Sequence, residues 1–183
     1  MTVSNTIPFH LRGNYAPVTD EITAENLEVR GSLPSELNGR YFRNGANPIT
    51  GESAHWFLGD GMIHGVRLRE GKAEWYRNRW VQTPFYENPS KPVIDLENLD
   101  FSSENSKANT HVVQHAGRIL CLEEGHVPWE ISKEMETLGP CSFDGQLDGS
   151  FTAHPKICPV TGEMLAFGYG LRPPYLTFYC ISS

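Results

Sequence analysis

The alternation of apolar and polar positions predicts that this 183-residue chain is built largely from antiparallel β-hairpins. In residues 62–81, apolar Val66 and Leu68 alternate with Arg67 and Arg69, as expected for a strand that is buried on one side only. Similar stretches, rich in β-branched and aromatic residues, flank turns that contain glycine. We therefore expect hairpins over residues 62–81, 110–123 and 152–168.

The remaining segments carry weaker patterns. Residues 1–38 are polar, contain several turn residues and predict an irregular lead-in, with the first strand beginning at about Gly39. Residues 128–139 are the one stretch that could pass for a helix, although it is short. This divides the chain into a lead-in, residues 1–38, and an all-β part, residues 39–183.

The spacing of the predicted turns indicates how the hairpins are arranged. Gly71, Gly117 and Gly162, one in each turn, are separated by 46 and 45 residues. A repeat of about 40–50 residues is typical of a β-propeller blade, although a sandwich or another barrel could show similar spacing by accident. A propeller needs about 4–8 blades to close, so about three blades would form an open part of a larger ring, with an unpaired edge at its last strand.

Composition and charge exclude several classes of protein. Hydrophobic residues make up 39% of the chain and aromatic residues 11%, which argues against disorder. The net charge of −7 and the scattered basic residues argue against a nucleic-acid partner. There is neither a secretory-signal pattern nor an apolar run of 18 residues, so we expect a cytoplasmic protein. The four cysteines lack metal-site spacing and are expected to be reduced thiols; they are Cys121, Cys141, Cys158 and Cys180.

Three histidines deserve comparison as candidate metal ligands. His111 and His115 are four residues apart, and in a strand this spacing separates them by about 13 Å, which is too far to share an ion. We expect them to be ordinary sheet-surface residues. His154 differs because Pro155, which follows it, belongs at a strand start or another position without a ladder hydrogen bond. A lone histidine is more often structural, so the residues alone leave ligation by His154 as the less favoured alternative.

Several motifs that occur in a fixed order along the chain favour a ligating role for His154 over a structural one. The chain resembles the N-terminal part of the carotenoid cleavage oxygenases, a family that includes apocarotenoid dioxygenases, lignostilbene dioxygenases and the retinal pigment epithelium isomerase. The resemblance rests on these segments, in order: GRYFRNGANP, HWFLGDGMIHGV, EWYRNRWVQTP, NTHVVQHAGRILCLEEG, ETLG and FTAHPKICPVTGEMLAFGY. It implies an all-β fold in which this chain forms about three blades of a seven-bladed propeller. It also implies that Fe(II) is held on the propeller axis by four histidines, and that O₂ cleaves an alkene to two carbonyl products.

The resemblance assigns roles to particular residues. It implies that His154, in the TAHP motif, is the first iron ligand. Ligating histidines need partners that fix their orientation. The glutamate that the family places about thirty residues before this ligand is matched by Glu123, or by Glu124 if the alignment is shifted by one residue. Stilbene-cleaving relatives tend to carry a lysine directly before that glutamate, whereas Leu122 stands here, which favours an apolar polyene substrate.

The resemblance also implies what the chain lacks. The other three iron ligands would follow Ser183, so we interpret the chain as the N-terminal part of an enzyme that is inactive by itself. Two alternatives stay open, a stilbene dioxygenase and a non-catalytic propeller fragment. The implied partners are O₂ and an apolar polyene or stilbene substrate, and the family adds peripheral membrane contact for substrate uptake as a further possibility.

Overall fold

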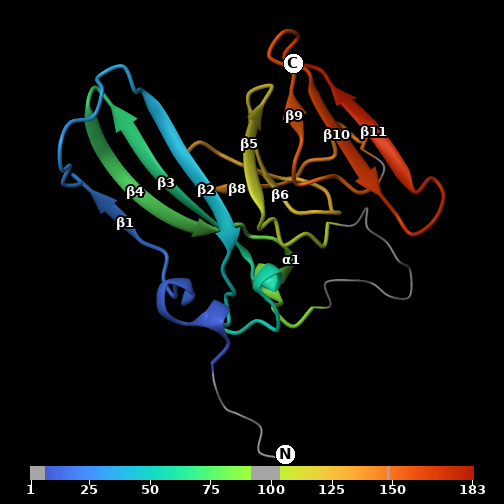
Figure 1. Cartoon of the computed structure of the whole chain (residues 1–183), viewed down its shortest axis with the longest axis horizontal. Coiled ribbons are helices and arrows are strands. Elements are labelled where there is room, and N and C mark those ends of the chain that lie inside the picture. Colours follow the sequence, from blue (N-terminus) through green and yellow to red (C-terminus); the bar gives the residue numbers. More distant parts are fainter. Residues whose placement is uncertain (1–6, 92–103, 148) are drawn as a thin grey trace, which may run out of the picture.

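The described residues form three antiparallel sheets that follow one another along the chain (Figure 1). The computed structural model describes residues 7–91, 104–147 and 149–183. The first sheet has the order β1-β4-β3-β2 and consists of β1 (Thr23–Glu25), β2 (Gly39–Ala46), β3 (Gly61–Arg69) and β4 (Lys72–Trp80). The second has the order β5-β6-β7-β8 and consists of β5 (His111–His115), β6 (Arg118–Leu122), β7 (Trp129–Ile131) and β8 (Thr137–Pro140). The third has the order β11-β10-β9 and consists of β9 (Lys156–Ile157), β10 (Met164–Tyr169) and β11 (Leu176–Ile181).

The three predicted hairpins are confirmed, and each lies in a different sheet. The pairs are β3 with β4, β5 with β6, and β9 with β10. In the turn of the first pair, Glu70 and Gly71 have φ angles of 49° and 74°, and Ala116 and Gly117 of the second have 46° and 78°. Two successive positive φ angles are what a type I′ hairpin turn requires. Hairpins spread over successive sheets are the arrangement of propeller blades, so the propeller interpretation of the turn spacing holds.

Two segments differ from their sequence-based predictions. Residues 128–139, which could have passed for a helix, form the β7–β8 hairpin, because Trp129 and Ile131 are buried on either side of a more exposed Glu130. In the lead-in, β1 pairs with β4, so this segment supplies the outer strand of the first sheet.

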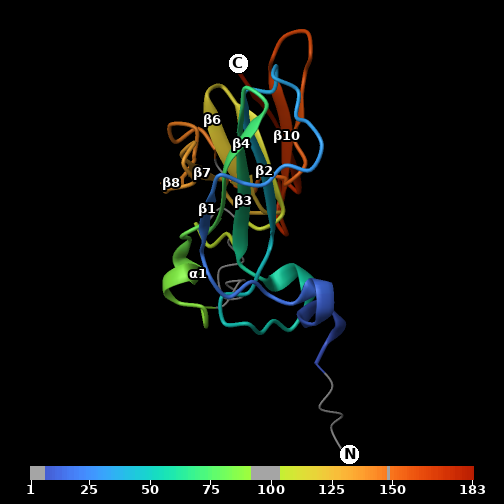
Figure 2. The ribbon, with the colours of Figure 1, turned by 90° about the vertical axis from the view of Figure 1, so that its left-hand side faces the viewer.

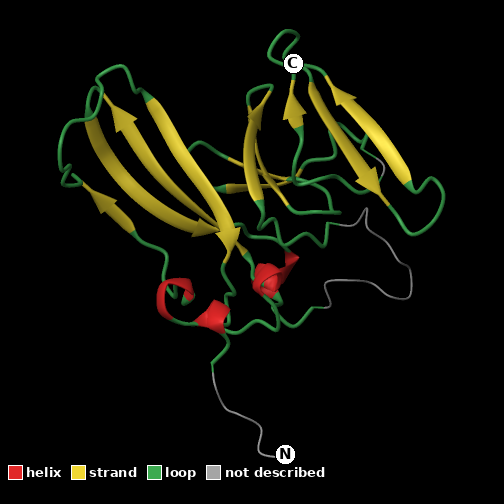
Figure 3. Ribbon diagram, in the orientation of Figure 1, coloured by secondary structure: helices red, strands yellow, loops and turns green. Residues whose placement is uncertain are grey.

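The helical elements are short and lie toward the end of the sheets at which β2 ends (Figure 3). They are the 3₁₀ helices η1 (Phe9–Leu11), η2 (Gly13–Tyr15) and η3 (Trp56–Leu58), and the α-helix α1 (Pro84–Glu87). No helix in the described ranges has the length and apolar character needed to cross a membrane.

The core consists of two apolar layers that share strand β6. Figure 2 shows the molecule from the side of the first sheet, behind which the other two sheets lie. Ile119 and Cys121 belong to the layer between the first and second sheets, whereas Leu120 and Leu122 belong to the layer between the second and third. Successive side chains of a strand point to opposite faces, so an almost continuous apolar run in β6 is buried on both sides. Strand β6 therefore holds the three sheets together through the hydrophobic effect.

Polar contacts join the first sheet to the second at two places. At the outer side, Glu134, in the turn between β7 and β8, forms ion pairs with Arg40 and Arg77. Desolvation opposes ionisation of Glu134, but its hydrogen bonds to these arginines and their charges hold the pKa of Glu134 below its ordinary value. At the inner side, the Asn44 side-chain amide donates to the carbonyl oxygens of Ala108 at 2.7 Å and His111 at 3.0 Å. These bonds bring the innermost strands β2 and β5 together.

A buried ion pair fixes the segment that enters the second sheet. The Lys107 ammonium lies 2.6 Å from an Asp60 carboxylate oxygen, and the two side chains are only 7% and 8% exposed. The other Asp60 oxygen accepts a hydrogen bond from the Ile49 amide at 2.9 Å, and the ammonium lies 4.4 Å from the centre of the Phe85 ring. The pair therefore has both hydrogen-bond partners and an aromatic face to offset its loss of hydration.

The backbone at this junction is as tightly packed as the ion pair. The Gly61 amide donates to the Lys107 carbonyl at 2.8 Å, and a Cβ atom at Gly61 would lie 2.3 Å from the Ala108 carbonyl oxygen. No side chain fits at that distance, so glycine is required for the two chain segments to approach each other.

We predict that Lys107→Met lowers the free energy of unfolding by about 3–5 kcal/mol, because it leaves the Asp60 carboxylate buried without its cation. Chemical denaturation measures this loss. The matched double variant Asp60→Asn/Lys107→Met contains no buried charge at this position, and its asparagine oxygen can still accept from Ile49, so it should recover much of the stability. A single variant as stable as the double variant would contradict the role of the ion pair.

Candidate site at the start of the third sheet

His154 lies two residues before the short strand β9 begins, and the buried Pro155 stands between them. Its side chain is 66% exposed, and its Nε2 atom lies 3.8 Å from a Glu124 carboxylate oxygen, which is longer than a hydrogen bond. The ring of His111 lies nearly parallel to that of His154, with an interplanar angle of 26° and centroids 6.4 Å apart. Within the part of the chain that the structure describes, the His154 imidazole therefore has no hydrogen bond, and its lone pair is available to a ligand.

The backbone that carries His154 is held by Glu124, which follows the end of β6. The Ala153 amide donates to a Glu124 carboxylate oxygen at 3.0 Å, and the Thr152 hydroxyl donates to the same oxygen at 3.3 Å. The Thr152 hydroxyl in turn accepts from the His154 amide at 3.0 Å. One carboxylate thus fixes three successive residues up to the free imidazole.

Glu123, the residue that the sequence analysis favoured as the partner of His154, points elsewhere. Its carboxylate accepts a hydrogen bond from the Lys107 amide, and its other oxygen lies 3.4 Å from Nδ1 of buried His126. The structure therefore brings Glu124, the one-residue alternative, next to His154. Tyr169 lies near both glutamates: burial raises the pKa of the Tyr169 hydroxyl, and the charges of Glu124 and Glu123 raise it further.

His111 was expected to be an ordinary surface residue, and this interpretation missed its contact with the third sheet. Its Nδ1 atom lies 2.9 Å from the Ala153 carbonyl oxygen. Since a carbonyl can only accept, Nδ1 carries the proton in this contact. His115, by contrast, is buried, and its Nε2 atom lies 2.7 Å from the Ser182 carbonyl oxygen. No feature of the sequence distinguishes the two histidines. In the structure they differ because His111 begins the innermost strand β5, whereas His115 ends it.

Leu122, the residue from which the sequence analysis inferred a polyene substrate, is a core residue. Its side chain is 1% exposed and packs in the apolar layer between the second and third sheets. It therefore contributes to the core, and this position carries no argument for or against a polyene substrate.

The side chains near His154 show how many ligands this chain could supply to an Fe(II) ion. Neutral imidazole is a suitable ligand for Fe(II), and His154 offers a free one on a fixed backbone. Among the described residues, however, no three histidine, cysteine, aspartate or glutamate side chains gather in a way that could hold a metal ion. The residues present fit a site to which this chain contributes one ligand.

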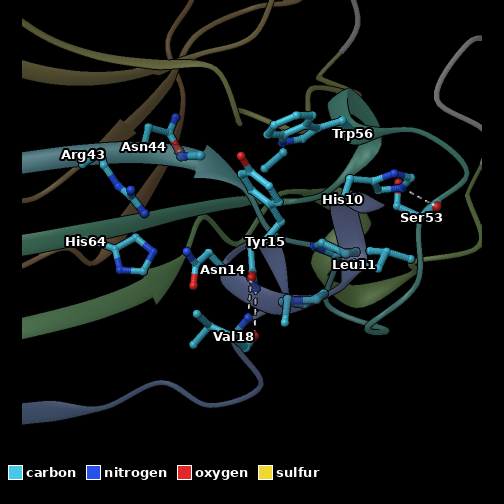
Figure 4. A pocket seen from close by; sticks show the side chains of 16 residues that line it. His10, Leu11, Asn14, Tyr15, Val18, Arg43, Asn44, Ser53, Trp56 and His64 are labelled. Atoms are coloured by element: carbon cyan, nitrogen blue, oxygen red, sulfur yellow. Dashed lines mark hydrogen bonds between the residues drawn. The ribbon is translucent and has the colours of Figure 1, made fainter. Parts of the chain in front are cut away.

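A separate cavity of about 390 Å³ lies between the lead-in and strand β2 (Figure 4). Arg43 and His64 contribute to its polar wall, and Nδ1 of His64 lies 2.8 Å from the Tyr76 hydroxyl. Burial lowers the pKa of His64, and the nearby charge of Arg43 lowers it further, so both favour the neutral imidazole. Neither His154 nor Glu124 lines this cavity, so it is distinct from the site at the third sheet.

Comparison with known proteins supports the resemblance seen in the motifs. The family model described as retinal pigment epithelial membrane protein matches residues 15–183. A carotenoid cleavage oxygenase of Mycobacterium tuberculosis is 45% identical over 177 residues, which cover 94% of this chain and 35% of that protein. Carotenoid 9,10(9′,10′)-cleavage dioxygenase 1 of Arabidopsis thaliana is 41% identical over 209 residues, which cover 96% of this chain and 39% of that protein.

Solved structures agree with this result. The crystal structure of Pseudomonas brassicacearum lignostilbene dioxygenase matches with a TM-score of 0.79 and 34% sequence identity, covering 97% of this chain and 41% of that one. The chain thus spans well under half the length of these relatives. Since the family model matches nearly all of it, the chain belongs to the retinal pigment epithelial membrane protein family, whose members include the carotenoid cleavage oxygenases.

Proposed function

We propose that the protein containing this chain is an Fe(II)-dependent dioxygenase that cleaves a carbon–carbon double bond of a carotenoid or apocarotenoid to give two carbonyl products. In this proposal His154 is the first of four histidine ligands, and the chain forms the first blades of a seven-bladed propeller. The observation that carries the proposal is the free His154 imidazole on a backbone fixed by Glu124. Relatives named carotenoid cleavage oxygenases and dioxygenases support the reaction type.

Each residue of the site has a defined task in this proposal. Fe(II), when bound, supplies the open coordination positions at which O₂ is activated. His154 supplies one neutral nitrogen donor. Glu124 holds the Ala153 amide and the Thr152 hydroxyl, and so keeps the His154 backbone in place before any metal arrives. Glu123, directly after β6, acts one step further away, because its carboxylate accepts from the Lys107 amide in the segment before β5.

The residue directly before the supporting glutamate does not match the stilbene-cleaving pattern. With Glu124 in that role, the preceding residue is Glu123, where the stilbene-cleaving pattern has a lysine. The cation of that pattern is therefore missing here, and the Glu123 carboxylate itself points to Lys107 and His126, so the choice of a polyene rests on the relatives that are named for carotenoid cleavage. Because polyenes partition into lipid, peripheral membrane contact during uptake belongs to the proposal.

A stilbene dioxygenase is the second candidate function. It is favoured by the structural match to the Pseudomonas brassicacearum enzyme, with its TM-score of 0.79. Both candidates use the same iron site, so they differ only in what occupies the substrate cavity.

We predict that His154→Ala removes most of the iron from the full-length protein, because a fixed site cannot recruit a substitute ligand. Glu124→Gln should weaken iron binding by about 10–100-fold, the usual cost of losing a group that supports a ligand. Metal analysis and anaerobic Fe(II) titration measure both effects.

Glu123→Gln is the matched control, since it makes the same change one residue away and should leave iron affinity closer to that of the wild type than Glu124→Gln does. Full iron occupancy in His154→Ala would show that the wrong histidine had been chosen. A larger loss in Glu123→Gln than in Glu124→Gln would reverse the roles of the two glutamates.

We also predict that Glu123→Lys raises the turnover of a hydroxylated stilbene relative to that of an apocarotenal, because the stilbene-cleaving pattern has a lysine at this place, and an ammonium gains from a phenolate but is costly against a polyene. The ratio of the two turnover rates, measured on one preparation, is insensitive to partial loss of folded protein. Glu123→Gln removes the charge without adding a cation and separates the two effects. An unchanged ratio in Glu123→Lys would mean that this position does not select the substrate.

A further inference from the structure

The peptide groups that flank Ala153 are held by side chains instead of by a neighbouring strand. The Ala153 amide donates to Glu124 at 3.0 Å, and its carbonyl lies 2.9 Å from Nδ1 of His111. His111 begins strand β5 of the second sheet and Glu124 lies two residues after strand β6 of the same sheet, whereas Ala153 leads into the third. The residue before the candidate ligand is therefore clamped from both sides by the preceding blade.

The local sequence explains why such a clamp is needed. Strand β9 is only two residues long, and its ladder with β10 involves only Lys156 and Ile157. Pro155 has no amide hydrogen with which to extend that ladder toward His154. Without side-chain partners, the buried Ala153 amide and carbonyl would be left unsatisfied, and each would cost free energy.

His111 also lies against the imidazole that it helps to position. Its ring is nearly parallel to that of His154, with a centroid distance of 6.4 Å. Its own main chain is tied to the first sheet, because the His111 carbonyl accepts from the Asn44 amide at 3.0 Å. His111 thus connects strands β2 and β5 with the segment that leads into β9.

We propose that His111 is a positioning residue for the metal site: its Nδ1–H holds the Ala153 carbonyl and thereby fixes the direction in which His154 presents its ring. The inference rests on the proposed role of His154 as a metal ligand. It assigns a function to a histidine that does not itself need to touch the metal.

The test compares two substitutions of His111 in the full-length protein. His111→Leu keeps a side chain of similar size but removes the donor, whereas the amide nitrogen of His111→Asn can occupy the place of Nδ1 and still donate to Ala153. We expect His111→Leu to weaken Co(II) and Fe(II) binding by about 10–100-fold and to shift the visible absorption bands of bound Co(II). His111→Asn should restore affinity and spectrum toward those of the wild type.

His115→Leu is the matched control, because it removes an equivalent imidazole–carbonyl contact to the third sheet, at Ser182, away from His154. It should lower the thermal midpoint and leave metal affinity and the Co(II) spectrum unchanged. Should His111→Leu fail to fold, His111→Ala replaces it with the same expected loss of affinity, since the exposed side chain leaves no buried cavity.

Each outcome bears on the proposal. Wild-type affinity and spectrum in His111→Leu would overturn the positioning role, as would equal losses in His111→Leu and His111→Asn, because the donor would then be irrelevant. Metal lost in His154→Ala but retained in His111→Leu would refute this inference alone. Metal retained in His154→Ala would refute the proposed function, and the inference with it.

Discussion

The geometry of the candidate site depends on how Lys107 joins the first two sheets. Its ammonium pairs with Asp60 in a nearly water-free position, its carbonyl accepts from the Gly61 amide, and its own amide donates to Glu123. One residue thereby connects the start of β3 with the end of β6. A surface ion pair would contribute little, but a buried pair whose hydrogen bonds are satisfied resists separation, because breaking it leaves a charge without solvent or partner.

The same junction also constrains the candidate site around His154. Glu123 and Glu124 follow directly after β6, and their carboxylates contact opposite neighbours, Lys107 on one side and Ala153 on the other. The Glu123 carboxylate fixes the chain at the end of β6, so the Glu124 carboxylate points to the loop that carries His154. Rigidity in the support of a ligand matters as much as the ligand itself, since metal affinity falls when the supporting groups are lost.

The sequence was informative where a local rule decides the structure. Turn glycines and two-residue alternation predicted the three hairpins, and their spacing predicted separate blades, because both depend on short-range conformational preferences. It was less informative where packing between sheets decides. The sequence suggested that Leu122 bears on the choice of substrate, but packing between the sheets places its side chain in the core. Which of two adjacent glutamates faces His154 depends on the exact end of β6. The contact of His111 with Ala153 joins residues 42 positions apart, and no local pattern encodes it.

The three innermost strands differ in how they use their polar side chains. Asn44 on β2 and His111 on β5 each donate to backbone carbonyls of the segment that follows, and so each blade positions the next. His154, before β9, is the first of these inner residues in the described chain whose side chain is left without such a bond. A side chain that is free because its neighbours carry the structural hydrogen bonds can serve a ligand without loss of stability. The first two sheets therefore supply the hydrogen bonds that hold the backbone around His154, and the His154 imidazole itself is left free. Such prior support of a ligand is what the proposed metal site would require.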